Sequence, residues 1–257
     1  MEMKKIGLQL FTVRTHFGTE EEARATFKKL AELGYSEAQT AGCYGFAYDK
    51  FREMAADAGI EIVGTHDNFD MMKKDIEGAI ENHKKLGTTN MGIGGFKPTC
   101  AKDVEDFIAI ANKIAARIAK EGMKFTYHNH HQEFVKLDNG RTAMEMLVEG
   151  LDPVNTSFVL DTHWVQRGGG DVCAWIEKLA GRIDILHLKD MQVYYDENMV
   201  VQPKIAEIGN GNLNWAEIIA TAERCGVKYY CVEQDNCPED FVPSLKQSAD
   251  YLKQFLK

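Results

Sequence analysis

Four polar side chains that commonly bind metal ions stand at the ends of apolar segments in the second half of the chain. They are His128, Asp161, His187 and Glu233, and each follows on a run of residues typical of a buried strand. A polar group at the end of a buried strand costs free energy unless a partner compensates for it. One divalent cation would compensate for all four groups, so the sequence predicts a shared metal site.

Two imidazoles and two carboxylates form a mixed nitrogen and oxygen ligand set. Such a set suits one divalent metal ion such as Mn²⁺, Co²⁺, Fe²⁺, Zn²⁺ or Mg²⁺ and differs from a thiolate site. The ion would act as a Lewis acid on a carbonyl and its neighbouring hydroxyl, and would stabilise the enediolate formed when a base removes the proton between them. Glu133 and Glu233 are the candidate bases. Lys189 is a candidate acid or oxyanion partner.

Two more histidines follow the same predicted strand as His128. His130 and His131 both lie close enough in sequence to compete with His128 for the ion. Because alternate side chains of a strand point to opposite faces, His130 shares the side of His128 and His131 lies on the other. The sequence leaves open whether His128 or His130 is the ligand, and the one that is not is expected to contact the substrate.

Three residues near other strand ends are further candidates for substrate contacts, namely Gln9, His66 and His163. His66 directly follows the predicted strand 60–65, and its structural alternative is a cap of the next helix. A lone polar residue after a strand is more often such a cap, or a satisfied core group, than a ligand. The repetition on consecutive strands favours the functional interpretation.

Short apolar runs alternate with amphipathic segments along the chain, and these are the elements that would position the polar residues. The predicted strands are 6–11, 36–38, 60–65, 90–93, 124–128, 156–161, 183–187 and 229–233. The predicted helices are 20–33, 49–58, 71–86, 102–120, 142–148, 172–179, 215–225 and 242–255. Eight strand–helix units predict an α/β fold, the (β/α)8 TIM barrel, whose strands all end at one face where active sites gather.

An open doubly wound sheet is the alternative fold. It would normally carry a glycine-rich phosphate loop after the first strand, and residues 12–15 here read Thr-Val-Arg-Thr. The longest stretch without a predicted element is 190–214. A long loop at this end of a barrel is commonly a lid or a substrate wall, and we expect that role here.

Composition limits the class of protein. The 257 residues suit one TIM barrel, so we expect a single domain over 1–257. A net charge of -9 without a basic cluster argues against a nucleic-acid partner. The six cysteines include no CxxC pair and are expected to be buried thiols and not a disulfide framework. No signal peptide and no apolar run of about 20 residues is present, so we expect a soluble, cytoplasmic protein without a membrane partner.

At these motifs the chain resembles the sugar phosphate isomerase/epimerase family, a xylose isomerase-like TIM barrel superfamily that also includes tagatose 3-epimerase-type enzymes and inosose dehydratase. The motifs that carry the resemblance lie at 7–14, 127–134, 160–164, 187–190, 207–211 and 232–235. They span nearly the whole chain. The resemblance implies a TIM barrel that acts on a sugar with a divalent metal ion.

The chain departs from the family pattern at one ligand. The family's epimerases usually bind the ion with Glu, Asp, His and Glu, and the two glutamates also form the acid–base pair. The resemblance matches the last three ligands to Asp161, His187 and Glu233, while His128 stands where the first glutamate is expected. A metal-bound imidazole cannot take up a substrate proton. The resemblance therefore implies either Glu133 as the second base, or a one-base isomerisation or elimination.

We expect a metal-dependent sugar isomerase or epimerase with a small-molecule sugar as its substrate. The absence of a clear Arg/Lys cluster near the proposed site favours a sugar without phosphate. A lyase of the inosose dehydratase or 3-keto-glycoside type is the alternative enzyme, and a non-catalytic sugar-binding barrel or a purely structural metal site are the alternatives outside catalysis. Barrels of this kind often pair, so a homo-oligomer is compatible with the sequence.

Overall fold

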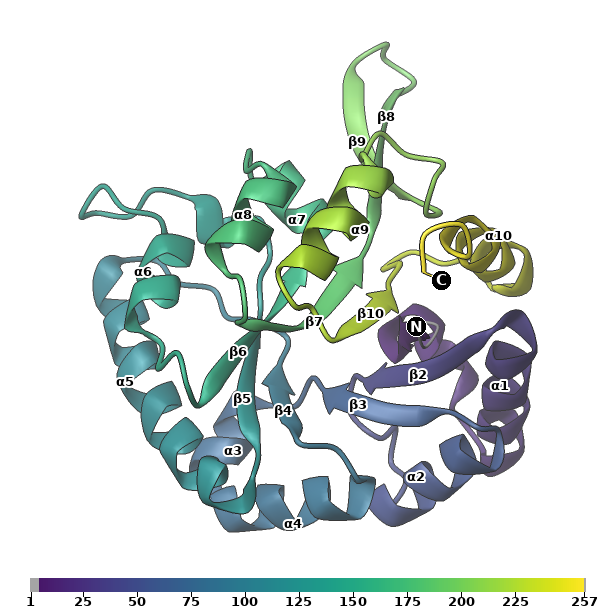
Figure 1. The fold of residues 1–257 in the computed structure, drawn as a ribbon, viewed down its shortest axis with the longest axis horizontal. Helices are drawn as coiled ribbons and strands as arrows, with labels where there is room; N and C mark the ends of the chain where they lie inside the picture. Colours follow the sequence, from purple (N-terminus) through teal and green to yellow (C-terminus); the bar gives the residue numbers. More distant parts are fainter. Residues whose placement is uncertain (1–4, 257) are drawn as a thin grey trace.

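Eight parallel strands form a nearly closed barrel in the computed structural model, which describes residues 5–256 (Figure 1). Their order around the sheet is β3 (Glu61–Thr65), β2 (Tyr35–Thr40), β1 (Ile6–Gln9), β10 (Tyr229–Val232), β7 (Ile183–Leu188), β6 (Thr156–Asp161), β5 (Lys124–His128) and β4 (Asn90–Ile93). The predicted TIM barrel is confirmed. Residues 1–4 and 257, the ends of the predicted domain, lie outside the described residues.

Individual bonds, and not a continuous ladder, close the barrel between β3 and β4. Asp67 and Ile93 form one parallel bridge, and the Asp67 N–H donates to the Gly92 carbonyl oxygen at 2.8 Å. The Gly92 N–H donates to the Thr65 hydroxyl at 3.1 Å. A Cβ atom on Gly92 would lie 2.3 Å from the Thr65 carbonyl oxygen, so the close approach of the two strands requires glycine.

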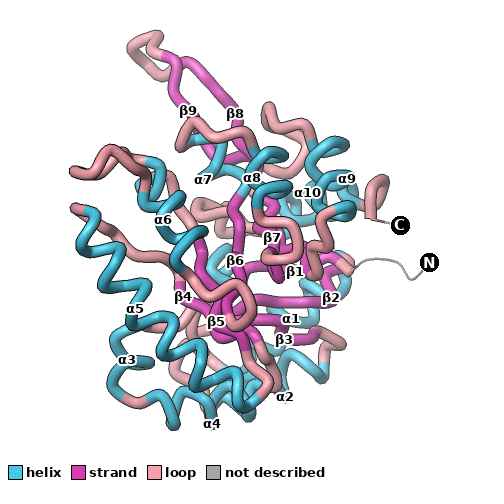
Figure 2. The backbone as a smooth tube through the Cα atoms, turned by 60° about the vertical axis from the view of Figure 1, so that its left-hand side comes forward, coloured by secondary structure: helices cyan, strands magenta, loops and turns pink. Residues whose placement is uncertain are grey.

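Helices cover the outer face of the barrel and connect successive strands (Figure 2). They are α1 (Glu20–Leu33), α2 (Tyr48–Asp57), α3 (Phe69–Lys74), α4 (Ile76–Leu86), α5 (Ala101–Ile118), α6 (Ala143–Gly150), α7 (Thr162–Arg167), α8 (Val172–Lys178), α9 (Trp215–Arg224) and α10 (Val242–Leu252), with 3₁₀ helices η1 (Leu10–His16), η2 (Ala119–Glu121) and η3 (Gln132–Phe134). Local signals set their ends. In α1, the Thr19 hydroxyl accepts from the Glu22 N–H and the Glu22 carboxylate from the Thr19 N–H, while Gly34 ends the helix with φ 99°.

Two predicted elements differ from the structure because a side chain bonds to nearby backbone. The predicted helix 71–86 is two helices, since Asp75 ends α3 and its carboxylate accepts from the Gly78 N–H to cap α4. The predicted strand 6–11 ends at Gln9. The Gln9 side chain accepts from the Phe11 N–H and begins η1. Such local bonds offer the backbone an alternative to the apolar pattern.

The stretch 190–214, predicted to be irregular, contains an antiparallel hairpin. Strands β8 (Asp190–Tyr195) and β9 (Val201–Ala206) pair with each other and project beyond the barrel (Figures 1 and 2). One face of the hairpin carries apolar pairs, which are Met191 and Ile205, Val193 and Pro203, and Tyr195 and Val201. The sequence prediction was wrong here because it did not use the alternation of polar and apolar residues at 190–195 and 201–205, which is the pattern of a half-buried strand. A lid or wall role for this stretch stays a prediction.

The core lies between the strands and the helices, and a smaller apolar layer fills the barrel. Val63, Val159, Ile185 and Cys231 form this inner layer. The six cysteines are free thiols, as expected, but only Cys43 and Cys231 are buried and the other four are partly exposed. No helix within residues 5–256 combines the length and the apolar character that a membrane span requires.

Candidate metal centre

The four predicted ligands meet at the carboxyl-terminal end of the barrel. One ligand atom from each of His128, Asp161, His187 and Glu233 lies within 4.8 Å of the other three, and all four residues are buried. The Nδ1 atom of His187 lies 2.9 Å from Glu233 Oε2 and 3.7 Å from Asp161 Oδ2. The Nε2 atom of His128 lies 3.5 Å from Asp161 Oδ2. Atoms that share one ion are roughly 3 to 4 Å apart, so this spacing suits a single ion.

Strand alternation explains why these side chains converge. Side chains two positions apart on a strand point to the same face. Three residues of the inner apolar layer are each followed two positions later by a member of the cluster: Val159 by Asp161, Ile185 by His187 and Cys231 by Glu233. The cluster therefore lies directly above the apolar layer, inside the barrel.

Lys189 brings a positive charge into this cluster. Its buried Nζ atom lies 2.8 Å from Asp235 Oδ2, 3.2 Å from Glu233 Oε2 and 3.5 Å from Asp161 Oδ2. Burial alone would lower the pKa of Lys189, but these three carboxylates raise it above its ordinary value. When His187 is neutral, as a metal ligand must be, three carboxylates and one ammonium leave two negative charges, which one divalent cation would balance.

The same charges act on His187. Burial would lower its pKa, yet Glu233 and Asp161 outweigh that effect and raise the pKa of His187 to about 9. Against the opposing effect of burial, Lys189 and His187 hold the pKa of Glu233 below its ordinary value, so this carboxylate is ionised at neutral pH. A proton on His187 and a metal ion would compete for the same position, because a histidine ligand must be neutral.

His130 lies beside the cluster but is not a member of it. Its ring is 4.7 Å from the His128 ring between centroids, and burial, together with His128, lowers the pKa of His130 to about 3. The geometry therefore brings His128 into the cluster in preference to His130. The Nδ1 atom of His130 is buried and has no hydrogen-bond partner, so it is available to a ligand.

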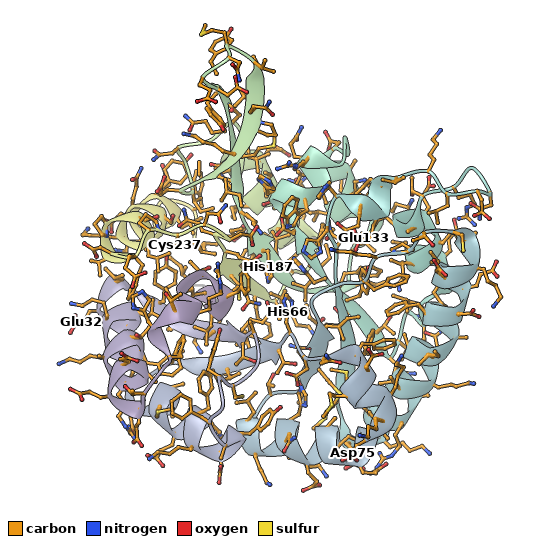
Figure 3. The ribbon with its side chains drawn as sticks, turned by 180° about the vertical axis from the view of Figure 1, so that it is seen from behind. Glu32, His66, Asp75, Glu133, His187 and Cys237 are labelled. Atoms are coloured by element: carbon orange, nitrogen blue, oxygen red, sulfur yellow. The ribbon has the colours of Figure 1, made fainter. Side chains whose placement is uncertain are left out.

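Gln9 and His66 also lie beside the cluster. The His66 ring is 4.8 Å from the His128 ring and 5.4 Å from the His187 ring, and Figure 3 shows His66 and His187 close to the barrel axis. Gln9 is buried and donates to Gln39 on β2 at 2.9 Å. Gln39 was not predicted as a site residue, although its oxygen also lies within hydrogen-bond distance of His187 Nε2.

His163 and Glu133 are held by groups outside the cluster. The buried His163 ring places Nδ1 3.2 Å from the Asp190 carbonyl oxygen. Glu133 accepts from the Tyr127 hydroxyl at 2.7 Å and from the His130 N–H at 3.0 Å, which occupies both of its oxygens. Figure 3 shows Glu133 well away from His187. The structure thus gives Glu133 a role in shaping the turn after β5 and does not bring it to the metal ligands.

Trp164 and Asp235 are site residues that the sequence prediction missed. The Lys189 Nζ atom lies 4.9 Å from the centre of the Trp164 ring, so the half-buried indole covers the ammonium. The backbone N–H of Trp164 donates to Asp161 Oδ1 at 2.9 Å, while Asp161 Oδ2 faces the cluster. The three-residue spacing of Asp161 and Trp164 is that of a helix cap, and it is the signal that places the indole here.

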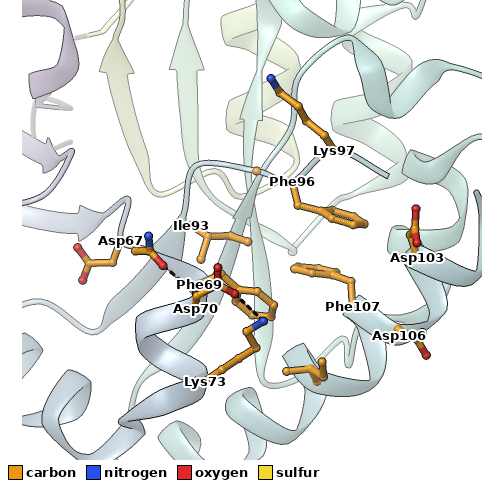
Figure 4. A pocket seen from close by; sticks show the side chains of 13 residues that line it. Asp67, Phe69, Asp70, Lys73, Ile93, Phe96, Lys97, Asp103, Asp106 and Phe107 are labelled. Atoms are coloured by element: carbon orange, nitrogen blue, oxygen red, sulfur yellow. Dashed lines mark hydrogen bonds and ion pairs between the residues drawn. The ribbon is translucent and has the colours of Figure 1, made fainter. Parts of the chain in front are cut away.

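Two cavities lie at the ends of β2, β3 and β4. A cavity of about 350 Å³ is lined by Tyr48, His66, Asp67, Met71 and Met72, among others. A second, of about 690 Å³, lies between α3 and α5 and is lined by Asp67, Phe69, Lys73, Phe96, Lys97 and Phe107, among others (Figure 4). Cavities of this size are typical of small-molecule sites. His66 belongs to the smaller cavity and also touches the cluster, so that cavity adjoins the metal ligands.

Comparison with known proteins adds to this geometry. A family model described as xylose isomerase-like TIM barrel matches residues 27–255. Among solved structures, a sugar phosphate isomerase/epimerase from Parabacteroides distasonis ATCC 8503 is similar, with 23% identity, a TM-score of 0.82 and coverage of 100% of this chain and 96% of that one. A probable 3-DHS dehydratase from Bacillus anthracis has 15% identity and a TM-score of 0.74, with coverage of 97% and 98%.

A D-allulose 3-epimerase from Methylomonas sp. is similar as well, with 12% identity, a TM-score of 0.74 and coverage of 99% of this chain and 98% of that one. At these identities the solved structures share the fold. A comparison with curated proteins found no significant match.

Proposed function

Since the chain belongs to the xylose isomerase-like TIM barrel family, we propose that it is a metal-dependent sugar isomerase or epimerase that acts through an enediolate. One observation carries this proposal: four metal-binding side chains converge within 4.8 Å, and when both histidines are neutral the carboxylates of Asp161, Glu233 and Asp235 exceed the charge of Lys189 by two. The proteins of similar fold that are named as an isomerase/epimerase and as a D-allulose 3-epimerase support a sugar as the substrate. We further propose that residues 1–257 form one domain.

The residues of the cluster fit a divalent ion. His187 Nδ1 is buried and has no hydrogen-bond partner, although two carboxylates lie beside it. His128, Asp161, His187 and Glu233 would hold the ion through nitrogen and oxygen atoms, which suits Mn²⁺, Co²⁺, Fe²⁺, Zn²⁺ or Mg²⁺. The bound ion would supply Lewis-acid polarisation of a substrate carbonyl and an adjacent hydroxyl.

Glu233 is the base that we assign to the proton transfer. It is ionised at neutral pH, because Lys189 and His187 hold its pKa low despite burial. A carboxylate with a low pKa is a weak base, so the substrate must be polarised before it gives up its proton. Lys189, 3.2 Å from Glu233, would stabilise the charge that develops on a substrate oxygen. His66 and His130 would form hydrogen bonds with hydroxyl groups of the substrate.

A lyase is the second candidate, and the surroundings of His128 favour it. An epimerase that uses two bases needs an acid–base group on each face of the sugar, whereas the cluster offers Glu233 and an imidazole. Glu133, which could supply the other base, has both oxygens engaged. An elimination needs one base and one acid, and Glu233 and Lys189 suffice for it. The similar fold of a protein named as a probable dehydratase is consistent with this candidate.

Metal analysis followed by a substrate screen in deuterated water tests the proposal. The purified protein is loaded with Mn²⁺ and incubated with keto-sugars and inososes, and products are resolved by mass. An isomerase or epimerase incorporates deuterium at carbon and otherwise conserves mass, a dehydratase loses water, and a glycoside lyase releases an aglycone. Binding of a sugar without deuterium uptake or turnover would identify a non-catalytic barrel and reject the proposal.

A further inference from the structure

Two buried glutamines join His66 and His187 at the barrel mouth. Gln9 ends β1, Gln39 lies on β2, and neither is exposed to solvent. The Nε2 atom of Gln9 lies 2.9 Å from Oε1 of Gln39. A glutamine amide can point either way on shape alone, so its orientation has to follow from neighbours that can only donate or only accept.

Backbone groups at both ends of the pair decide the orientation. The Phe11 N–H can only donate, and it donates to Gln9 Oε1 at 3.2 Å. The Thr65 carbonyl oxygen can only accept, and it lies 3.5 Å from Gln39 Nε2. The amino group of Gln9 therefore points to Gln39, and the oxygen of Gln39 points back to Gln9 and on to the metal cluster.

The oxygen of Gln39 determines which nitrogen of His187 carries hydrogen. His187 Nε2 lies within hydrogen-bond distance of Gln39 Oε1, which has no proton to give. Nε2 must therefore be the donor. In a neutral ring the other nitrogen, Nδ1, then has a free lone pair, and Nδ1 is the atom that faces Asp161 Oδ2 and Glu233 Oε2. A histidine held in this way presents Nδ1 to an ion.

The second hydrogen of the Gln9 amide acts on His66 in the same manner. Gln9 Nε2 lies 3.2 Å from His66 Nδ1, so Nδ1 is the acceptor and Nε2 carries the ring hydrogen. This N–H is buried and has no hydrogen-bond partner among the described residues. The His66 ring lies beside those of His128 and His187 and also lines the smaller cavity. It therefore offers a donor to an oxygen atom of a substrate.

We propose that Gln9 and Gln39 form a relay that sets two histidine tautomers at once. Gln39 makes His187 a metal ligand through Nδ1, and Gln9 makes His66 a hydrogen-bond donor through Nε2. Both glutamines act through the histidines and are positioning residues. The inference about His187 rests on the proposed metal centre, whereas the inference about His66 does not need an ion. Loss of a partner that orients a histidine ligand typically weakens metal binding about 10- to 100-fold.

The test combines two measurements, the nitrogen-15 NMR signals of the histidine rings and the affinity of the protein for Zn²⁺. Nitrogen-15 NMR of the histidine rings in the Zn²⁺-loaded protein should show hydrogen on Nε2 and zinc on Nδ1 of His187. Gln39→Leu should weaken Zn²⁺ binding about 10- to 100-fold in competition with a chelator. Gln39→Glu keeps an acceptor oxygen at the same place and should retain the Nδ1 coordination. Gln192→Leu, on the hairpin, is the matched control and should change neither measurement.

Each alternative result has a distinct meaning. Zinc on Nε2 of His187, or unchanged Zn²⁺ affinity in a folded Gln39→Leu protein, overturns the relay. The wild-type signals decide the question even if Gln39→Leu does not fold. A protein that binds no divalent ion refutes the metal centre, and the relay is then tested on His66. In the ion-free protein the Nε2 tautomer of His66 should be present, and Gln9→Leu should abolish the preference. A wild-type His66 with hydrogen on Nδ1 refutes the relay.

Discussion

The two ends of the barrel both bury charged side chains, but they balance them differently. At the amino-terminal ends of the strands, three carboxylates pair with three lysines: Lys5 with Glu37 and Glu61, and Lys124 and Lys228 with Asp184. At the carboxyl-terminal ends, Asp161, Glu233 and Asp235 share Lys189. The first end is neutral by itself. The second end needs another positive charge, which marks it as the end that takes a ligand.

The carboxylates at the two ends also differ in pKa. Burial outweighs the attraction of Lys5 and raises the pKa of Glu37 to about 7. At the other end, Lys189 and His187 outweigh burial and hold the pKa of Glu233 low. A carboxylate at the first end can become neutral by taking a proton. Asp161 and Glu233, whose pKa values are held low, stay ionised and can bind a cation.

Removal of Lys189 is expected to have the largest effect. Lys189→Met leaves the buried carboxylates of Asp161 and Glu233 without their lysine partner, and breaking a buried ion pair by removing one partner costs roughly 3 to 5 kcal/mol. Urea denaturation measures this loss, and Mn²⁺ should restore part of the stability because it replaces the missing charge. Lys228→Met at the other end is the control, and should cost about 1 kcal/mol or less because Lys228 is half exposed. Equal losses of unfolding free energy in Lys189→Met and Lys228→Met would show that the two ends of the barrel balance their buried charges alike.

Glu37→Gln should stabilise the protein at high pH. The folded-state pKa of about 7 lies above the ordinary value of 4.5, so the contribution of Glu37 is fully present below pH 4.5 and is lost as the pH rises through 7. At pH 8 the variant should be more stable than the wild type by about 3 kcal/mol, since the pKa of Glu37 rises from 4.5 to about 7 and each pKa unit is worth about 1.4 kcal/mol. Thermal or urea unfolding from pH 4 to 8 measures the difference. A wild-type curve parallel to that of the variant would show that Glu37 is not perturbed.

Metal affinity should rise with pH because the ion must displace a proton from His187. With a pKa of about 9, His187 is mostly protonated at pH 7, so apparent affinity should rise about tenfold per pH unit and level off near pH 9. In the ion-free protein the sign for stability is the opposite: the contribution of His187 is present below its ordinary pKa of 6.5 and is lost through pH 9. Chelator competition from pH 6.5 to 9.5 checks this, and an affinity that stays flat between pH 7 and 8.5 would contradict it.

Two substitutions of Asp161 separate the effect of its negative charge on metal binding from the effect of its helix cap on stability. Asp161→Asn keeps an oxygen that can accept from the backbone N–H of Trp164 but lacks the negative charge that faces the cluster. Both Asp161→Asn and Asp161→Ala should lose metal binding, and Asp161→Ala should be less stable than Asp161→Asn by about 1 kcal/mol, the usual value of a helix cap. The comparison is made on ion-free proteins by urea denaturation. Identical stability of the two variants would show that the cap contributes nothing.

The sequence predicted the members of the cluster because their signal is local. The predicted strands 124–128 and 156–161 have the same bounds as β5 and β6, and a polar residue at the end of an apolar strand is visible without knowledge of its neighbours. His187 likewise required only the strand before it. Their convergence then followed from the barrel, which brings all carboxyl-terminal strand ends to one face.

The rest of the site depends on contacts that no local pattern contains. Gln39 meets His187 across 148 residues of sequence, on a strand that was predicted only as 36–38. Glu133 was predicted as a base because it follows β5, but the 3₁₀ turn η3 directs its carboxylate back to the Tyr127 hydroxyl. The direction of a side chain after a strand depends on the turn, and the sequence did not reveal this turn.

The incomplete joint between β3 and β4 has a consequence for motion. Every other neighbouring pair of barrel strands shares a backbone ladder, whereas this pair is held by one bridge and by bonds through side chains. Few bonds have to break for β3 and β4 to separate. Local opening of the barrel should therefore begin between these two strands, and it should appear as fast hydrogen exchange of the Asp67 amide. Asp67 also lines both cavities. The part of the barrel that opens most readily therefore borders both cavities, where a ligand would enter.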